Sequence, residues 1–258
     1  MILGKYETNK IYNEDCYNAI HNLPDKCIDL VYMDPPYEYT SGFNERLGEW
    51  VKSETTDQVK QLSGGINYSF LDDLVRVMKY ICIYIWCNDK QIIDYINYFV
   101  NQHNCDYKIL AWYKNNPMPL YAKRFLDDCE YCLMFVEKGK TKFKGTDSYE
   151  NSFKIYTGSI NAKDKKLFLH PTIKPIECVR NHIQKTLSKG VCLDPFLGSG
   201  TTAVACKELG IDYIGFEINK EYYDIAVDRL NCLTQADKAN HQQITIFDFI
   251  GDENEIQN

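Results

Sequence analysis

The most informative stretch of the sequence is Gly190-Val191-Cys192-Leu193-Asp194-Pro195-Phe196-Leu197-Gly198-Ser199-Gly200-Thr201-Thr202. Its apolar beginning predicts a buried strand, and the pattern of residues 201–209 predicts a helix directly after the glycines. Between them, Gly198 and Gly200 let the backbone turn sharply and approach a ligand, because neither carries a Cβ atom. A helix that begins at such a turn offers unpaired N–H groups that suit a carboxylate or a phosphate. The stretch therefore predicts a strand, a ligand-binding turn and a helix in direct succession.

A carboxylate stands at the end of the next predicted strand. Residues 212–216 are typical of a strand, and Glu217 follows them, seventeen residues after Gly200. Its side chain can accept two hydrogen bonds from a ribose diol. No Gly-Lys-Ser/Thr follows the glycines, which excludes a P-loop, whereas Ala203 in the place of a third glycine leaves NAD open. On this motif alone, a tight turn without any ligand also stays open.

A second special loop, Asp34-Pro35-Pro36-Tyr37, follows the buried strand predicted at residues 27–33. The two prolines stop both strand pairing and helix, so the loop must be rigid. Methylation of an amino group on an aromatic base requires acceptors for both N–H hydrogens, and Asp34 with the Pro35 carbonyl can supply them. Tyr37 offers a face on which a flipped-out base can stack, worth about 1–3 kcal/mol. A simple Pro-Pro turn beside an acidic residue is the alternative.

The rest of the chain alternates between strand and helix patterns. Further strands are predicted at residues 10–13, 81–86, 107–113 and 130–136, and further helices at 16–23, 69–80, 90–102, 176–187 and 220–230. Such alternation predicts an α/β fold, with a mostly parallel sheet of seven strands and helices on both faces. Residues 138–168 show no clear element. Ligands of such sheets bind beyond the carboxyl ends of the strands, so we expect both special loops at one edge.

Composition places the chain among ordinary globular proteins. The 258 residues are 45% hydrophobic and 25% charged, enough for one large domain or one domain with an insertion. No apolar run approaches the roughly 18 residues of a membrane span, and the first residues lack the apolar stretch of a signal peptide. We therefore expect a cytoplasmic protein. The eleven cysteines are odd in number and scattered, which favours reduced, mostly buried thiols and no metal site.

The charge of the chain is uneven. The net charge is −7, but residues 138–189 hold twelve Lys or Arg against four Asp or Glu. A local basic surface on an acidic body can hold a phosphate backbone, although lysine-rich stretches are commonly just solvated faces. The lysines at 138, 140, 142 and 144 alternate, so on a strand they would share one face.

Both loops together resemble the signatures of DNA amino-methyltransferases. Asp34-Pro35-Pro36-Tyr37 is similar to the catalytic loop of that family, and Asp194 to Thr201 is similar to its cofactor loop. The catalytic loop comes first here, which resembles the circularly permuted beta group of bacterial and phage enzymes. Asn13 to Cys16, His170 to Pro175, residues 112–116, Arg124, Phe125 and Glu130 also look like family segments, with Glu14 in place of a glycine. The resemblance spans residues 10–230 and implies a Rossmann-like methyltransferase fold.

The resemblance also implies roles for individual residues. In the catalytic loop these are Asp34, Pro35, Pro36 and Tyr37. S-adenosylmethionine would be held by Asp15, Cys16, Asp34, His170, Thr172, Lys174, Asp194, Phe196, Gly198, Ser199, Gly200, Thr201 and Glu217. Asp15 and Cys16 would lie near its adenine, and Thr172 and Lys174 near its methionine end. Contact of Lys174 with a DNA phosphate is the alternative for that residue.

In the family, the segment before the His-Pro motif recognises the target sequence. Here it corresponds to residues 138–168, the part where the excess of basic charge begins. The DNA-binding candidates are Lys138, Lys140, Lys142, Lys144, Lys163, Lys165 and Lys166. The chain is thus expected to contain a catalytic half at 1–137, a recognition segment at 138–168, a cofactor-binding half at 169–232 and a tail at 233–258.

The resemblance implies methyl transfer from S-adenosylmethionine to DNA, and Asp34 rather than Ser favours adenine N6 over cytosine N4. Methylation at cytosine C5 requires a Pro-Cys nucleophile, and the sequence has no Pro-Cys dipeptide. A non-catalytic, methyltransferase-like DNA-binding subunit is the alternative from another class. A homodimer and a cognate restriction endonuclease are left open as partners.

Overall fold

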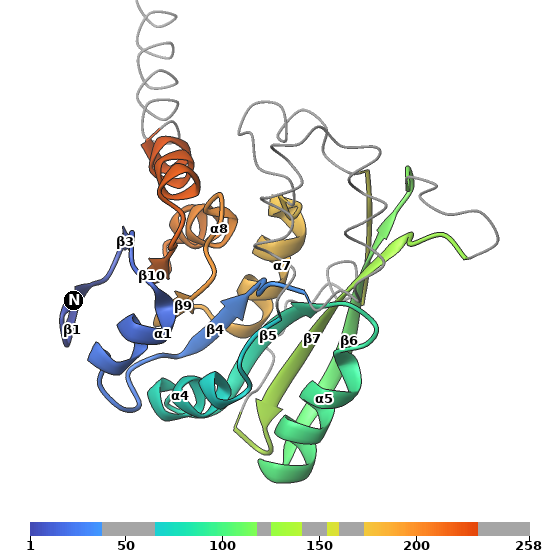
Figure 1. The fold of residues 1–258 in the computed structure, drawn as a ribbon, viewed down its shortest axis with the longest axis horizontal. Helices are drawn as coiled ribbons and strands as arrows, with labels where there is room; N and C mark the ends of the chain where they lie inside the picture. The colour runs from blue at the N-terminus through green and yellow to red at the C-terminus, as the bar shows by residue number, and fades with distance from the viewer. Residues whose placement is uncertain (38–64, 118–124, 141–153, 160–172, 232–258) are drawn as a thin grey trace, which may run out of the picture.

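A computed structural model describes residues 1–37, 65–117, 125–140, 154–159 and 173–231. Its centre is an eight-stranded sheet in the order β3-β10-β9-β4-β5-β7-β6-β8, with helices on both faces (Figure 1). The strands are β3 (Lys10–Tyr12), β4 (Leu30–Met33), β5 (Cys82–Cys87), β6 (Cys105–Lys114), β7 (Cys129–Glu137), β8 (Ile155–Gly158), β9 (Val191–Asp194) and β10 (Asp212–Phe216). A short hairpin of β1 (Ile2–Leu3) and β2 (Tyr6–Glu7) precedes them. The predicted α/β class is confirmed.

The prediction of seven strands was wrong by one. The eighth strand, β8, lies in the segment for which the sequence predicted no clear element, and it pairs with β6 in parallel. Strand β7 pairs with both of its neighbours in antiparallel fashion, and the other pairs in this sheet are parallel. As a result, the end of β6, the start of β7 and the end of β8 lie at the same edge as the carboxyl ends of β4 and β9.

The two central strands β4 and β5 are buried on both faces, as their continuous apolar runs require. Their side chains alternate between two cores. Val31 and Met33 join one core with helix α4 (Ser69–Val77), and Leu30 and Tyr32 join the other with α7 (Ile176–Thr186) and α8 (Thr201–Leu209). Helices α4 and α5 (Ile92–Ile96) therefore cover one face, and α7, α8 and the helical residues 220–231 cover the other (Figure 1).

The predicted helices form with small changes in length. Residues 16–23 split into α1 (Cys16–Ala19) and a 3₁₀ turn (Ile20–Asn22), and α5 continues as a π-helix (Asn97–Gln102). Helix α4 ends at Val77 because Met78 turns extended and forms a parallel bridge with Ile28. Within the described ranges, no helix is long and apolar enough to cross a membrane. The ten cysteines there carry free thiols, as the sequence predicts.

The order of the strands reverses direction between β9 and β4. From β9 the chain passes through α8 to β10 on one side, and from β4 it passes through α4 to β5 on the other. Strands β4 and β9 pair in parallel, with Leu30 beside Cys192 and Val31 beside Leu193. Open α/β sheets bind their ligands in the crevice at such a switch point. Both loops singled out in the sequence begin at this point.

Candidate active site

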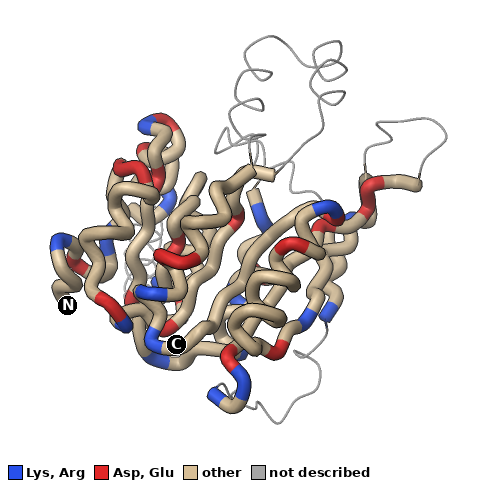
Figure 2. Tube along the Cα trace, turned by 60° about the horizontal axis from the view of Figure 1, so that its bottom comes forward, with Lys and Arg blue, Asp and Glu red and all other residues tan. Residues whose placement is uncertain are grey.

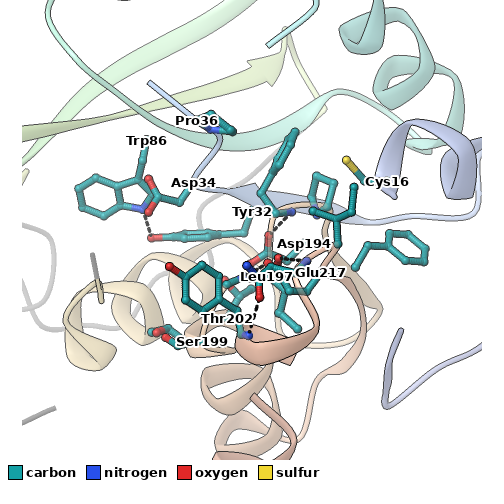
Figure 3. A pocket seen from close by; sticks show the side chains of 18 of the residues that line it. Cys16, Tyr32, Asp34, Pro36, Trp86, Asp194, Leu197, Ser199, Thr202 and Glu217 are labelled. Atoms are coloured by element: carbon teal, nitrogen blue, oxygen red, sulfur yellow. Dashed lines mark hydrogen bonds between the residues drawn. The ribbon is translucent and has the colours of Figure 1, made fainter. Parts of the chain in front are cut away.

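A cavity of about 390 Å³ opens where β4 and β9 end. Figure 3 shows Trp86, Asp34 and Tyr32 on one side of it, with Cys16 and Glu217 on the other. Its walls come from both loops and from the strands beside them: Asp15, Cys16, Tyr17, Tyr32, Asp34, Pro36, Gly65, Trp86, Lys174, Val179, Asp194, Pro195, Phe196, Leu197, Gly198, Ser199, Thr201, Thr202, Phe216, Glu217, Ile218, Asn219 and Tyr222. The expectation that the two loops meet at one edge of the sheet is confirmed.

The glycine loop turns in the left-handed region that favours glycine. Gly198 has φ +53° and Gly200, the residue that caps helix α8, has φ +85°. A Cβ atom on Gly200 would lie 2.9 Å from the Cβ of Ala226, closer than side chains tolerate. Gly200 is therefore required by its own backbone angle and by the packing of the helical residues 220–231 against the loop.

A buried arginine, Arg229, donates hydrogen bonds to the glycine loop. Arg229 Nη1 donates to the Ser199 carbonyl oxygen at 2.6 Å, to Ser199 Oγ at 2.8 Å and to Thr201 Oγ1 at 3.2 Å. Sequence reasoning missed Arg229, because a single basic residue in an amphipathic helix carries no local signal of burial. The hydroxyls of Ser199 and Thr201 thus accept hydrogen bonds from the protein itself, and each keeps its own proton to donate to a ligand.

Glu217 closes the cavity beside the glycine loop. Its side chain accepts from the backbone N–H of Gly198 at 2.7 Å and of Asn219 at 2.8 Å. The residue is 8% exposed, and burial raises the pKa of its carboxyl while the N–H donors oppose that rise. Each carboxylate oxygen has a lone pair left for a further donor. The geometry fits the predicted contact with a ribose diol.

Asp194 lies between the two loops at the end of β9. It accepts from the backbone N–H of Phe196 at 3.0 Å and is 4% exposed. Burial raises the pKa of this carboxyl to about 7. Two further predicted residues, Asp15 and Cys16, face the same cavity from the start of α1, where Asp15 caps the helix by accepting from the N–H of Tyr17.

Asp34 is the charged group of the proline loop, and both of its oxygens have partners. Lys174 Nζ lies 2.5 Å from Oδ2, and the Tyr37 hydroxyl donates to Oδ1 at 2.8 Å. Burial raises the pKa of Asp34, and the Lys174 ammonium opposes that rise. Pro36 lines the cavity, and Pro35 is buried.

Lys174 is buried and lines the same cavity. Its side chain is 6% exposed, and its ammonium bridges Asp34 to Glu130, which lies 3.2 Å away. The same ammonium lies 5.1 Å from the ring centre of Trp86 and 5.5 Å from that of Tyr37. The burial of this paired ammonium gives no support to the alternative of a contact with a DNA phosphate.

Two aromatic residues of the central strands, Tyr32 and Trp86, also escaped the sequence analysis. Trp86 Nε1 donates to the Tyr32 hydroxyl at 3.1 Å, and both side chains line the cavity beside Asp34 (Figure 3). The alternation of side chains along these strands could have identified both residues. Trp86 and Tyr32 point to the same face as their neighbours Tyr84 and Leu30, towards helix α7.

The basic candidates are only partly described. Lys142, Lys144, Lys163, Lys165, Lys166, His170 and Thr172 lie outside the described residues. Lys138 and Lys140 are exposed, but residues 138–140 form a turn after β7 rather than a strand with a shared face. Because β7 runs antiparallel to β5, this turn lies at the edge opposite the cavity. In the described parts, acidic and basic positions are intermixed along the chain (Figure 2).

Comparison with known proteins identifies the family. A model of the DNA methylase family, which groups N6 and N4 methyltransferases, matches residues 28–228. The type II methyltransferase M2.LlaDCHI of Lactococcus lactis subsp. cremoris is 28% identical over 240 residues, covering 86% of this chain and 88% of that protein. The type II methyltransferase M.HinfI of Haemophilus influenzae is 30% identical over 248 residues, covering 86% of this chain and 68% of that protein.

Solved structures agree with this assignment. The complex of M1.HpyAVI with S-adenosylmethionine superposes with a TM-score of 0.61 at 25% identity, covering 85% of this chain and 98% of the other. The cytosine-N4-specific PvuII DNA methyltransferase gives a TM-score of 0.65 at 16% identity, covering 88% of this chain and 89% of the other, and shows the likeness of fold. Since the family model spans both loops of the cavity and most of the sequence, the chain belongs to the DNA methylase family of N6 and N4 methyltransferases.

Proposed function

We propose that this protein transfers a methyl group from S-adenosylmethionine to N6 of adenine in DNA. One observation carries the proposal: a single cavity joins the Asp34-Pro35-Pro36-Tyr37 loop to the glycine loop and Glu217. The first provides hydrogen-bond acceptors for an amino group, and the second provides a site for a nucleoside with an acidic end. The related M1.HpyAVI, 25% identical, has been solved with S-adenosylmethionine.

The cofactor half of the cavity has the residues that S-adenosylmethionine needs. The volume of about 390 Å³ falls within the range of small-molecule sites. Glu217 would accept hydrogen bonds from the ribose hydroxyls, and the amino end of helix α8 at Gly200 and Thr201 would favour the methionine carboxylate. Asp15, Cys16 and Phe196, which line the cavity, would border the adenine, and Asp194 and Ser199 would lie between the two ends. The bound cofactor supplies an electrophilic methyl group.

The proline loop prepares the amino group that attacks. The Asp34 carboxylate and the Pro35 carbonyl accept its two N–H hydrogens, which frees the nitrogen lone pair from the ring and aims it into the cavity. Tyr37 and the exposed edge of Pro36 hold the flipped-out base. Asp34, where cytosine-N4 enzymes favour Ser, is the residue that selects adenine in this proposal.

Residues 138–168 are assigned to recognition of the target sequence, with the lysines at 142, 144, 163, 165 and 166 as contacts to DNA phosphates. We assign residues 169–232, which include His170 and Thr172, to the cofactor-binding half and residues 233–258 to a tail. The named relatives are type II methyltransferases, which favours a cytoplasmic enzyme that works beside a restriction endonuclease.

The proposal is tested by incubating the purified chain with labelled S-adenosylmethionine and DNA that contains all short sequence contexts. We expect label in N6-methyladenine at one recurring sequence, located by mapping the modified bases. Label in N4-methylcytosine would overturn the assignment of the base but not of the reaction. DNA binding without any transfer of label, to duplex or single strand, would overturn the enzyme in favour of a binding subunit.

A further inference from the structure

We propose that Lys174, held in place by Glu130 and Lys114, is a positioning residue that keeps Asp34 as an ionised acceptor. The inference rests on the proposed function of Asp34 and gives Lys174 a role at the catalytic loop instead of the methionine end of the cofactor. Its basis is a row of four alternating charges that ends at Asp34 and that begins on the β6–β7 hairpin, outside both loops.

The four groups contact one another in sequence. Lys114 Nζ lies 2.6 Å from Glu130 Oε1, Glu130 Oε2 lies 3.2 Å from Lys174 Nζ, and Lys174 Nζ lies 2.5 Å from Asp34 Oδ2. The side chains of Lys114, Glu130 and Lys174 are 14%, 23% and 6% exposed. Such close pairing of largely buried charges fixes the position of each ammonium and carboxylate.

Elements far apart in the sequence supply these groups. Lys114 ends β6, Glu130 is the second residue of β7, and Lys174 stands just before helix α7. All three lie at the edge of the sheet where β4 ends and Asp34 follows. The antiparallel course of β7 is what brings Glu130 to this edge, since a parallel strand would place its start at the opposite end.

The charges of the row cancel. Two ammonium groups face two carboxylates, so the row can be buried as a neutral whole, whereas a carboxylate alone in the same place would take up a proton. Two lysines hold the pKa of Glu130 at about 2, and its two acidic partners raise the pKa of Lys174. Lys174 therefore stays charged and Glu130 stays ionised.

Ionisation of Asp34 matters for the proposed chemistry. A carboxylate accepts hydrogen bonds only, whereas a protonated carboxyl turns one oxygen into a donor that clashes with an incoming N–H. Each oxygen of Asp34 has a second lone pair, so the amino group of a base can bind while Lys174 and Tyr37 keep their contacts. Lys174 does not need to leave the site for the base to enter.

Several charged or titratable groups face Asp34. Lys174 and the Tyr37 hydroxyl favour the ionised form, and Glu130 opposes it. Asp194 lies close enough to interact with Asp34 from the end of β9, and the neutral thiols of Cys87 and Cys132 face it from β5 and β7. Lys174 is the one cation among these groups in the described part of the chain. Its removal should therefore change the pKa of Asp34 more than the removal of any other of these groups.

The test has a spectroscopic readout that needs no substrate. Protein labelled with ¹³C at the Asp carboxyls is titrated by NMR, and the Asp34 signal is assigned with Asp34→Asn. In Lys174→Met we expect the pKa of Asp34 to rise by about 1–3 units, since a cation within contact distance is lost. The acid limb of the single-turnover rate at saturating cofactor and DNA should move to higher pH by the same amount.

Glu130→Gln should shift the pKa of Asp34 in the opposite direction. It therefore also tests the inference if Lys174→Met fails to fold. It removes a negative neighbour of Asp34 and leaves the Lys174 cation in place, so the pKa of Asp34 and the acid limb should move to lower pH. Lys174→Arg keeps the charge and should restore most of the wild-type profile. Lys79→Met is the matched control: this lysine pairs with Asp29 at 2.8 Å, away from the cavity, and its loss should leave the profile unchanged.

The outcomes separate this inference from the proposed function. An unchanged titration of Asp34 in Lys174→Met, or a rise in its pKa in Glu130→Gln, would overturn the inference whether or not the protein methylates DNA. A loss of cofactor affinity of tenfold or more by calorimetry in Lys174→Met, with Asp34 titrating as in the wild type, would return Lys174 to the methionine end. A chain without methyl transfer that still shows both NMR shifts would refute the function alone.

Discussion

The neighbours of Asp34 fix the orientation of its carboxylate. Its oxygens already accept from Lys174 and Tyr37, so the carboxylate is fixed in direction before any base arrives. Fixed acceptors lower the barrier of a reaction because they need no rearrangement as charge develops. The side chain should therefore matter for turnover far more than for the affinity of the cofactor.

We predict that Asp34→Ala lowers the single-turnover rate by on the order of 10²-fold or more, about 2.7 kcal/mol of barrier, and leaves the Kd for the cofactor nearly unchanged. Rates are measured with labelled cofactor and affinities by calorimetry. Asp89→Ala removes an exposed carboxylate after β5 and serves as the control. A rate near that of the wild type would remove Asp34 from the mechanism.

Asp194 gives a prediction for stability. Its pKa in the folded, ligand-free protein is about 7, raised by burial from 3.8. A carboxyl with a raised pKa binds its proton more tightly in the folded state, so its contribution is complete below pH 4 and disappears as pH rises through 7. The neutral variant Asp194→Asn keeps an oxygen that can accept from Phe196 and should escape this loss.

We therefore expect the Tm of Asp194→Asn to exceed that of the wild type at pH 8 and the difference to shrink steadily as the pH falls towards 4, by calorimetric scans without ligand. Asp127→Asn replaces an exposed carboxyl and should show no such trend. A difference in Tm that stays constant between pH 5 and pH 8 would contradict the assigned ionisation.

At this scale the local sequence pattern located residues that follow strands, but it could not locate those whose place depends on distant contacts. Asp34, Asp194 and Glu217 end apolar runs, so local pattern located them at the binding edge. The local pattern does not place Arg229 or Lys174 at the binding edge in this way. Their positions depend on partners 28 to 30 residues away for Arg229 and 140 residues away in the case of Lys174 and Asp34.

Among the elements, helix α8 and its glycine turn depend on packing as well as on backbone angles. Gly200 and Gly210 cap the two ends of the helix with φ +85° and +66°. They differ in their surroundings: a Cβ on Gly200 meets Ala226, whereas none of the described residues lies within 4 Å of a Cβ on Gly210. The pair makes it possible to separate backbone strain from crowding.

Gly210→Ala should reduce the free energy of unfolding by about 1–2 kcal/mol, the cost of a left-handed angle. Gly200→Ala should cost about 1–3 kcal/mol more, because the side chain also crowds the helical residues 220–231. Urea denaturation measures both. Adding Ala226→Gly to Gly200→Ala should recover part of the difference, and equal losses in the two single variants would show that the crowding is absent.

Strand β8 marks the limit of prediction at this scale. Its four residues alternate between exposed and half-buried, and Ile155 is 60% exposed. Such a short edge strand forms because β6 offers a partner, with Trp112 beside Tyr156 and Trp112 Nε1 donating to the Gly158 carbonyl oxygen at 3.0 Å. Tertiary pairing of this kind leaves only a weak trace in the local sequence.

For the whole molecule, the decisive feature is the pairing of β4 with β9 across most of the chain. Fold class and the location of the cavity could be predicted, because alternation of strands and helices implies a parallel sheet with one binding edge. The strand count and the buried charges could not be predicted, because they depend on which strands become neighbours. A ligand in this cavity contacts both halves and should stabilise the sheet as a unit.

Cofactor at 100 times its Kd should stabilise the wild type by about 2.7 kcal/mol, seen as a rise in Tm. In Glu217→Gln an amide N–H₂ must face a backbone N–H, so we expect a Kd raised on the order of tenfold, a smaller rise in Tm and DNA affinity close to the wild type. Lys5→Ala, at an exposed ion pair with Glu14, is the control. Weaker DNA binding with an unchanged cofactor response would contradict the ribose assignment.

The row from Lys114 to Asp34 also restricts how this sequence can drift. A replacement that removes the charge at any one of its four positions leaves an unmatched charge in a largely buried place and lowers the stability of the chain. Related sequences are thus expected to carry complementary substitutions at pairs of these positions, or none. Glu130 of strand β7 and Lys174, two residues before helix α7, should then covary among related sequences.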